Sequence, residues 1–187
     1  MINDNEMITM SEAQMLALWR RTLHLDVARR ECVLERDDGI DQDEYLLDKM
    51  RQWYAHLLMT ASAELLPIED VSVDVTLAVS DDGVVTAMLP PRCVRAVEWQ
   101  LAGWEHSVTW FPQPELPAAQ RQLNPWTRGG TCNPAAVDHG DRLMLYSLPT
   151  GVSPVLTMAR CVVRPADGAY VLHQSLLDTI PEFKVID

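Results

Sequence analysis

The chain has 187 residues, of which 48% are hydrophobic and 22% charged, and its formal net charge at pH 7 is −12. This length suits one domain with a hydrophobic core or a pair of small lobes, and the composition is ordinary for a soluble globular protein. A chain this acidic is not expected to bind nucleic acid tightly, because phosphate binding depends on Lys and Arg side chains.

The N-terminal stretch MINDNEMITM has neither the basic nor the apolar region of a signal peptide. No apolar run approaches the roughly 18 residues of a membrane span. The cysteines are widely spaced and form no CxxC pair, which argues against structural zinc and against a disulfide framework. We therefore expect four reduced thiols in an intracellular protein: Cys32, Cys93, Cys132 and Cys161.

A first helix is expected from Ser11, which with Gln14 has the pattern of a capping box, to a break near Gly39. Its apolar stripe consists of Leu16, Trp19, Leu23 and Val27. The opposite face is basic and carries Arg20, Arg21, Arg29 and Arg30. This basic face is either simply solvated or a stripe that docks a partner.

A second helix is expected from Asp41, with Glu44 as the reciprocal cap, to the stop at Pro67. Its apolar stripe consists of Leu46, Met50, Trp53, Leu57 and Ala61. Each helix would be about 24 residues long, and a short connection between two long helices predicts an antiparallel hairpin over residues 1–67.

After Pro67 the apolar period changes to two, which predicts strands. A strand over Val71–Val79 and a second over Val84–Leu89 are joined by the turn Ser80–Gly83, as in a β-hairpin. The further strands expected along the chain are Arg92–Leu101, Ser107–Phe111, Leu143–Leu148, Val155–Val163 and Ala169–His173. A helical turn is expected over Ser175–Ile180.

Residues 112–141 have no regular period and contain five prolines. A loop of about thirty residues is far longer than the usual 4–6 and is normally functional or disordered. The predicted fold class is α+β: an N-terminal antiparallel helical hairpin (1–67), followed by an antiparallel β-sheet or small barrel (68–187) that carries the long loop. We expect the two regions to form one compact unit.

The long loop is the obvious place to look for catalysis. Cys132 with His139 as base, oriented by Asp138 or Asp141, would form a nucleophilic site, but no cysteine-enzyme signature surrounds them. The alternative is a half-buried Cys and a surface His in a turn-rich loop. The histidines have no metal-ligand spacing, and Arg128-Gly129-Gly130 lacks the rest of a phosphate loop. We predict that the protein is not an enzyme, that it binds no cofactor, and that it has no catalytic, cofactor-binding or metal-binding residue.

Several short motifs resemble head–tail connector, or gatekeeper, proteins of tailed bacteriophages and prophages. In the first part of the chain they are Asp82-Gly83, Leu89-Pro90-Pro91, Arg92–Val97, Gly103-Trp104 and Val108-Thr109. In the second part they are Leu123-Asn124-Pro125, Arg128-Gly129, Pro134-Ala135 and Leu143–Ser147. The chain departs from the family at Pro91, where an acidic residue is usual, and in its shorter C-terminal helical segment.

The resemblance implies a non-enzymatic structural protein that forms a ring between portal and tail proteins. DNA would pass through such a ring without specific binding, helped by repulsion from acidic side chains. The protein would lie in the bacterial cytoplasm before assembly and in the virion if the prophage is functional, with no membrane partner. The predicted contact residues are Trp104, Trp110, Trp126, Arg128, Arg20 and Arg21.

Two other functions remain open from the residues. One is an intracellular α+β binding module whose ligand site is the 112–141 loop. The other is a small Cys-dependent hydrolase that uses Cys132 and His139. The hydrolase would need a reactive Cys132. The binding module would be a monomer that a small ligand stabilises against thermal unfolding.

Overall fold

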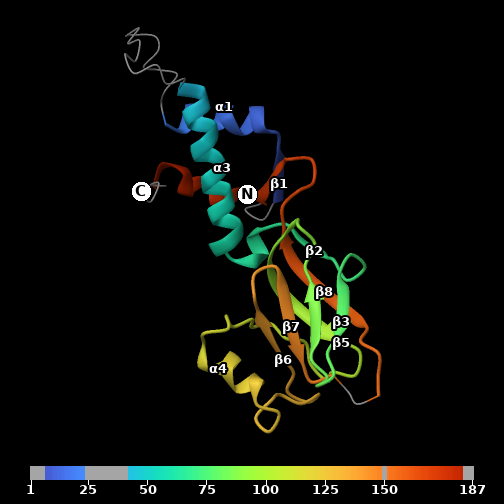
Figure 1. Ribbon diagram of the computed structural model, residues 1–187. Coiled ribbons are helices and arrows are strands. Elements are labelled where there is room, and N and C mark those ends of the chain that lie inside the picture. The colour runs from blue at the N-terminus through green and yellow to red at the C-terminus, as the bar shows by residue number, and fades with distance from the viewer. Residues whose placement is uncertain (1–6, 24–41, 149–150, 183–187) are drawn as a thin grey trace, which may run out of the picture. The chain divides into compact units, whose positions relative to one another are not determined.

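The computed structural model describes residues 7–23, 42–148 and 151–182 (Figure 1). Helices and antiparallel strands are both present, so the fold class is α+β as predicted. The chain divides into two compact units, one of Met1–Pro67 with Arg164–Asp187 and the other of Ile68–Val163. One division between these units follows residue 67, and residues 164–187 group with the N-terminal unit and not with the β-rich segment.

The first unit contains β1 (Met7–Met10), α1 (Glu12–Thr22), α3 (Gln42–Thr60), the 3-10 turn η1 (Ala63–Leu65), β9 (Tyr170–His173) and the 3-10 helix η3 (Gln174–Glu182). β1 pairs antiparallel with β9, with Met7 opposite His173 and Met10 opposite Tyr170. This pairing explains the grouping, because it joins the C-terminal segment to the N-terminal one.

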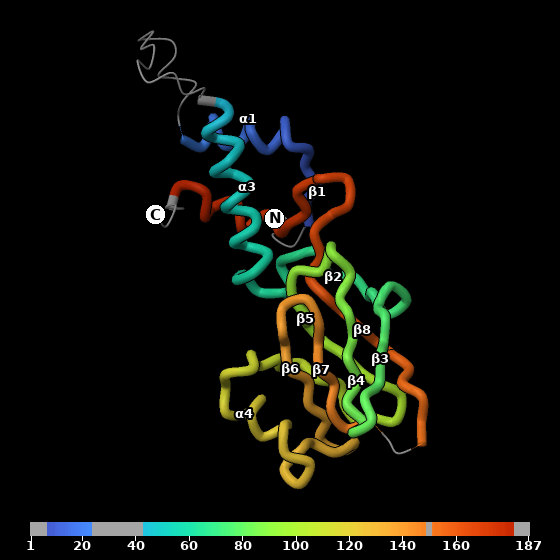
Figure 2. The backbone as a smooth tube through the Cα atoms, viewed as in Figure 1, coloured from blue at the N-terminus to red at the C-terminus, as the bar shows by residue number. Residues whose placement is uncertain are grey.

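α1 begins with the predicted capping box: the Ser11 hydroxyl accepts from the Gln14 N–H, and the Gln14 side chain accepts from the Ser11 N–H. The helix ends at Thr22. The rest of the predicted first helix and its break at Gly39 lie outside the described residues. Figures 1 and 2 show α1 running across α3 and not alongside it, so the predicted antiparallel hairpin is not confirmed.

The apolar stripe of α3 is confirmed, since four of its five predicted members are buried: Leu46, Met50, Trp53 and Leu57. The indole of Trp53 packs edge-on against that of Trp19, with ring centroids 5.7 Å apart. Its N–H donates to the hydroxyl of Thr179 in η3 at 3.0 Å. The Tyr54 hydroxyl donates to the Val171 carbonyl and accepts from the Val171 N–H, so α3 holds both C-terminal elements of this unit.

The second unit contains β2 (Ile68–Asp70), β3 (Thr76–Val79), β4 (Val85–Met88), β5 (Cys93–Leu101), α4 (Pro117–Gln120), the 3-10 turn η2 (Arg121–Leu123), β6 (Ala135–Asp138), β7 (Arg142–Tyr146) and β8 (Leu156–Val163). Its strands form two antiparallel sheets, in the orders β2-β8-β5 and β3-β4-β7-β6. Both sheets contribute to one core, in which Trp99, Leu101, Leu143 and Leu145 are at most 1% exposed.

Two predicted strands differ from the structure. The stretch Val71–Val79 is interrupted, because the Asp70 carboxylate accepts from the Ser72 N–H and the Val71 carbonyl accepts from the Asp74 N–H. These bonds form a turn that leaves Val73 89% exposed. Residues 107–111 form only a single bridge between Val108 and Trp99. The predicted hairpin turn is confirmed, with Gly83 at φ +77° between β3 and β4.

Candidate functional site

The candidate site is the β5–β6 connection, residues 102–134, which joins the two sheets of the second unit. The long loop predicted for residues 112–141 is partly regular, because it contains α4, η2 and β6. Four large apolar side chains of the connection are exposed: Trp110 (63%), Leu116 (45%), Leu123 (64%) and Trp126 (94%). We call these four residues the exposed apolar set. Large apolar side chains are more often buried than exposed, so this segment is the candidate contact surface of the second unit.

Trp126 projects from a turn whose backbone is held by hydrogen bonds. Its own N–H donates to the side-chain oxygen of Asn124 at 3.0 Å, and the Arg128 N–H donates to the Asn124 carbonyl at 3.0 Å. The Thr127 hydroxyl donates to the Arg121 carbonyl at 2.6 Å. The indole is therefore exposed on an ordered backbone, and binding a partner here would cost little backbone entropy.

Arg128 fastens this turn to the β3–β4 hairpin. Its guanidinium donates to the Gln122 carbonyl at 3.0 Å, and to the carbonyl and the carboxylate of Asp82 at 3.0 and 3.1 Å. It also lies 5.3 Å from the ring centroid of Tyr146, and its side chain is only 13% exposed. The Ser80 hydroxyl and then Arg128 lower the pKa of Asp82, so this carboxylate stays charged and keeps Arg128 in place.

Gly129 follows at a position where a side chain would not fit. A Cβ there would lie 2.6 Å from the Asn133 carbonyl oxygen, which is closer than a van der Waals contact allows. Its own carbonyl accepts from the Ser147 hydroxyl at 2.5 Å, and its N–H donates to the Gln122 side chain at 2.8 Å. Ser147 has φ +78°, a left-handed conformation that a non-glycine residue rarely adopts. The end of β7 thus holds the connection through a strained backbone position.

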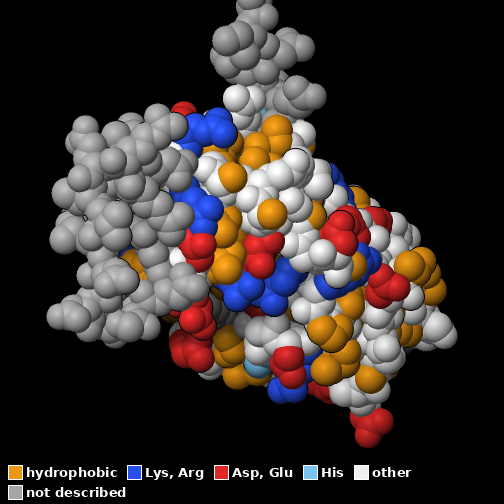
Figure 3. Space-filling model, turned by 90° about the horizontal axis from the view of Figure 1, so that it is seen from above, with side chains coloured by type: hydrophobic (Ala, Val, Ile, Leu, Met, Phe, Trp, Pro, Cys, Tyr) orange, Lys and Arg blue, Asp and Glu red, His pale blue; other side chains and the backbone are white. Residues whose placement is uncertain are grey.

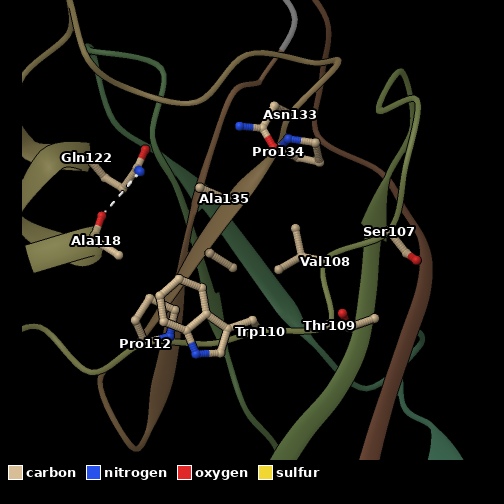
Figure 4. A pocket seen from close by; sticks show the side chains of 11 residues that line it. Ser107, Val108, Thr109, Trp110, Pro112, Ala118, Gln122, Asn133, Pro134 and Ala135 are labelled. Atoms are coloured by element: carbon tan, nitrogen blue, oxygen red, sulfur yellow. Dashed lines mark hydrogen bonds between the residues drawn. The ribbon is translucent and has the colours of Figure 1, made fainter. Parts of the chain in front are cut away.

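A pocket of about 270 Å³ opens in the same connection (Figure 4). Figure 4 shows that its lining side chains come from three segments: residues 107–112, α4 with η2, and residues 133–136. The lining is mixed in polarity. Val108, Trp110 and Pro112 are apolar, whereas Ser107, Thr109, Gln122 and Asn133 bring hydroxyls and amides. The amide of Gln122 donates across α4 and η2 to the Ala118 carbonyl at 3.3 Å. The pocket therefore offers both apolar surface and hydrogen-bonding groups, and the exposed indole of Trp110 is part of its lining.

The predicted contact residues are of three kinds: exposed, packed in the core, or occupied by contacts within the chain. Trp110 and Trp126 are exposed and belong to the apolar set. Trp104 is 5% exposed and donates its indole N–H to the Ser147 carbonyl at 3.0 Å, so it packs in the core. Arg128 is occupied by contacts within the chain. In the first unit, Arg20 forms an ion pair with Asp43, whereas Arg21 is exposed.

The structure does not bring Cys132 and His139 together as a catalytic pair. The exposed Cys132 thiol donates to the Glu105 carboxylate at 2.8 Å, and this carboxylate raises the pKa of Cys132. A raised pKa reduces the thiolate fraction at neutral pH, which is the opposite of what a nucleophile needs. His139 lies in the β6–β7 turn, where its N–H donates to the Arg142 carbonyl. Asp138 accepts from the Gly140 N–H at 2.7 Å and shapes the same turn.

Within the described ranges 7–23, 42–148 and 151–182, no group of three His, Cys, Asp or Glu side chains is arranged to hold a metal ion. None of the helices described there combines the length and apolarity needed to cross a bilayer. The face in Figure 3 has acidic, basic and apolar side chains interspersed, without a single block of one charge.

Sequence reasoning missed three parts of this site. It did not identify Leu116 and Leu123, although apolar residues within a Pro- and Gln-rich segment were a signal that could have found them. It also missed the contact of Gly129 with Ser147, because no local pattern indicates a serine with positive φ. No protein-family model matches the chain, and neither curated proteins nor solved structures gave a match.

Proposed function

We propose that the chain is a non-enzymatic structural protein of a phage or prophage head–tail connector, and that its β5–β6 connection docks neighbouring proteins. The observation that carries the proposal is the ordered display of Trp126, which is 94% exposed on a hydrogen-bonded turn. Trp is enriched among the residues that dominate binding energy at protein interfaces.

The rest of the apolar set supports a protein partner over a small ligand. Trp110, Leu116 and Leu123 add exposed apolar area to the same connection, and one Trp can bury about 150–250 Å². Arg128 holds the Trp126 turn by its hydrogen bonds to Asp82, so Arg128 would position Trp126 and would not itself contact the partner. The proposed partners are a portal protein, a tail protein and further copies of this chain.

Copies of one chain that meet through two different surface patches form a closed ring when the rotation between them closes. The net charge of −12 is compatible with a ring through which DNA passes without binding. In this proposal the protein lies in the bacterial cytoplasm before assembly and in the virion afterwards. Arg21, which is exposed on α1, is a second candidate contact.

The test is co-purification of the chain with phage-like particles from an induced source strain, read by quantitative mass spectrometry. We expect several copies of the chain per portal ring in wild-type particles and a strong loss with Trp126→Ala. Val73→Ala is the matched control, because Val73 is an 89% exposed apolar residue in the turn after β2. Particles that assemble normally without the chain would contradict the proposal.

The pocket lined by Trp110 favours a second candidate, a binding module for a small ligand. A pocket of about 270 Å³ is near the lower limit for a small-molecule site. A thermal-shift screen would then find a compound that stabilises the wild-type protein and Trp126→Ala but not Trp110→Ala. A compound with the same effect on all three proteins would bind elsewhere and would exclude this site.

A further inference from the structure

Cys93 and Cys161 lie on adjacent antiparallel strands, β5 and β8. Cys93 is opposite Val163, and Cys161 is two residues before Val163, so both thiols point to the same face of the sheet. That face is the core of the second unit: Cys161 is fully buried in it, and Cys93 packs against it. The sequence places these cysteines far apart, and only the strand register makes them neighbours.

The two thiols differ in character, and each affects the pKa of the other. A hydrogen bond from Cys161 lowers the pKa of Cys93, and the nearby Arg92 guanidinium acts in the same direction. The pKa of Cys161 is raised, first by Cys93 and then by burial. Cys93 is half-buried and Cys161 buried. Cys93 is thus the thiol that ionises and meets a reagent first, while Cys161 keeps its proton beside it.

We propose that Cys93 and Cys161 form a redox-active dithiol, which a hydroperoxide converts into a disulfide that links β5 to β8. The proposal does not depend on the connector function. Its basis is the shared face of the sheet, the common core cluster and the strand register, which makes the two cysteines diagonal neighbours on β5 and β8. It assigns to this pair a modification site that is separate from the exposed Cys132.

The chemistry balances in two steps. The Cys93 thiolate attacks the terminal oxygen of the hydroperoxide, the O–O bond breaks, and Cys93 becomes a sulfenic acid. The departing alkoxide or hydroxide takes up the proton that Cys93 released on ionising and leaves as an alcohol or water. Oxidation of Cys93 removes its thiolate, which is the first cause of the raised Cys161 pKa. The Cys161 sulfur then attacks the Cys93 sulfur, the S–O bond breaks, and the departing hydroxide takes the Cys161 proton as water. Two thiols are oxidised by two electrons, and one hydroperoxide is reduced.

The strand geometry requires a small adjustment for this bond. Diagonal neighbours in an antiparallel pair have Cα atoms about 7–8 Å apart, whereas a disulfide usually joins Cα atoms about 4.4–6.8 Å apart. The register of β5 against β8 shifts between Cys93 and Arg95, so β5 has an extra residue beside Cys93. A bulge of this kind gives the backbone the freedom to move Cys93 toward Cys161.

The experiment uses the full-length double variant Cys32→Ser/Cys132→Ser, which retains only this pair. Hydrogen peroxide is added at neutral pH, and the protein is denatured, alkylated and analysed by intact-mass and peptide mass spectrometry. We expect a mass loss of two hydrogens, no alkylated thiol, and a peptide that links Cys93 to Cys161 and disappears with dithiothreitol. Stepwise addition of oxygen to Cys93 without the linked peptide would overturn the proposal.

Two further variants in the same background separate the roles of the thiols. With Cys161→Ala, we expect the Cys93 sulfenic acid to persist long enough for capture by a cyclic diketone reagent. Because this change in a buried position can affect folding, Cys93→Ser at the half-buried position gives an independent test. We expect Cys93→Ser to make Cys161 at least tenfold slower to oxidise. Oxidation of Cys161 at an unchanged rate in that variant would contradict the proposed order of attack.

Discussion

Replacing Arg128 by Ala should loosen the β5–β6 connection more than any other single surface change in the second unit. The side chain is 13% exposed and makes two hydrogen bonds to backbone carbonyls, of Gln122 and Asp82, together with one to the Asp82 carboxylate. A hydrogen bond that involves a charged group contributes about 1.5–3 kcal/mol when buried.

Two further contributions are smaller. The Asp82 side chain is 57% exposed, so its ion pair with Arg128 contributes only about 0–1 kcal/mol. The contact with Tyr146 contributes about 0.5–1 kcal/mol. The freed carbonyls are near the surface and recover part of the loss by binding water. We therefore expect Arg128→Ala to reduce the local opening free energy by about 2–4 kcal/mol.

Hydrogen exchange read by mass spectrometry measures this loss in the segment itself. Since 1.4 kcal/mol corresponds to a factor of ten, amides of the connection near residues 124–133 should exchange roughly thirty- to several-hundredfold faster. Arg142→Ala is the matched control, because Arg142 is 45% exposed and its nearest acidic contact is a 3.9 Å pair with Asp141. Exchange in Arg128→Ala within about threefold of the control would show that the Arg128 contacts with Gln122 and Asp82 do not hold this segment.

Four other changes have defined outcomes. Trp126→Ala should change the unfolding free energy by less than about 0.5 kcal/mol in urea titration, because its indole is 94% exposed; a larger loss would mean that it packs. Glu105→Gln should speed alkylation of Cys132 by iodoacetamide at neutral pH, because the carboxylate raises the Cys132 pKa; equal rates would contradict this. Thr179→Val should cost about 1–3 kcal/mol in thermal unfolding, because it leaves the buried Trp53 N–H without its acceptor, whereas Thr179→Ser should retain most of the stability. A hydrogen bond from Arg51 lowers the pKa of Glu12 in the folded protein. The ionised Glu12 therefore stabilises the fold at a pH above its unfolded-state pKa, and this contribution is lost as the pH falls through the folded-state pKa. Acid unfolding of Glu12→Gln should lack this pH-dependent loss of stability.

The parts of the fold that sequence predicts well depend on contacts between near neighbours. The capping box at Ser11 and the hairpin turn at Gly83 each need only residues within a few positions, and both are present. The stripe of α3 follows from helical period alone. Val73 shows the limit of this reasoning, because alternation predicts a strand there, whereas hydrogen bonds accepted by the Asp70 carboxylate and the Val71 carbonyl form a turn.

The candidate site was harder to predict because exposure depends on distant partners. Trp104 and Trp126 both lie in irregular segments, yet only Trp104 finds a buried acceptor, at Ser147. Arginine is common among interface hot spots, but the Arg128 guanidinium is bound to Asp82, which lies in a turn 46 residues earlier. Sequence could therefore indicate which segment to examine, whereas the tertiary contacts decide which of its side chains are available to a partner.

The division of the chain into units has a consequence for its biosynthesis. Ile68–Val163 is continuous in sequence, so this unit can form all its strand pairs without any residue outside that segment. The other unit cannot, because β1 pairs with β9 and residues 1–67 must wait for residues 164–187. During translation the N-terminal strand therefore has an unpaired edge, which exposes this segment to misassembly until the last part of the chain emerges.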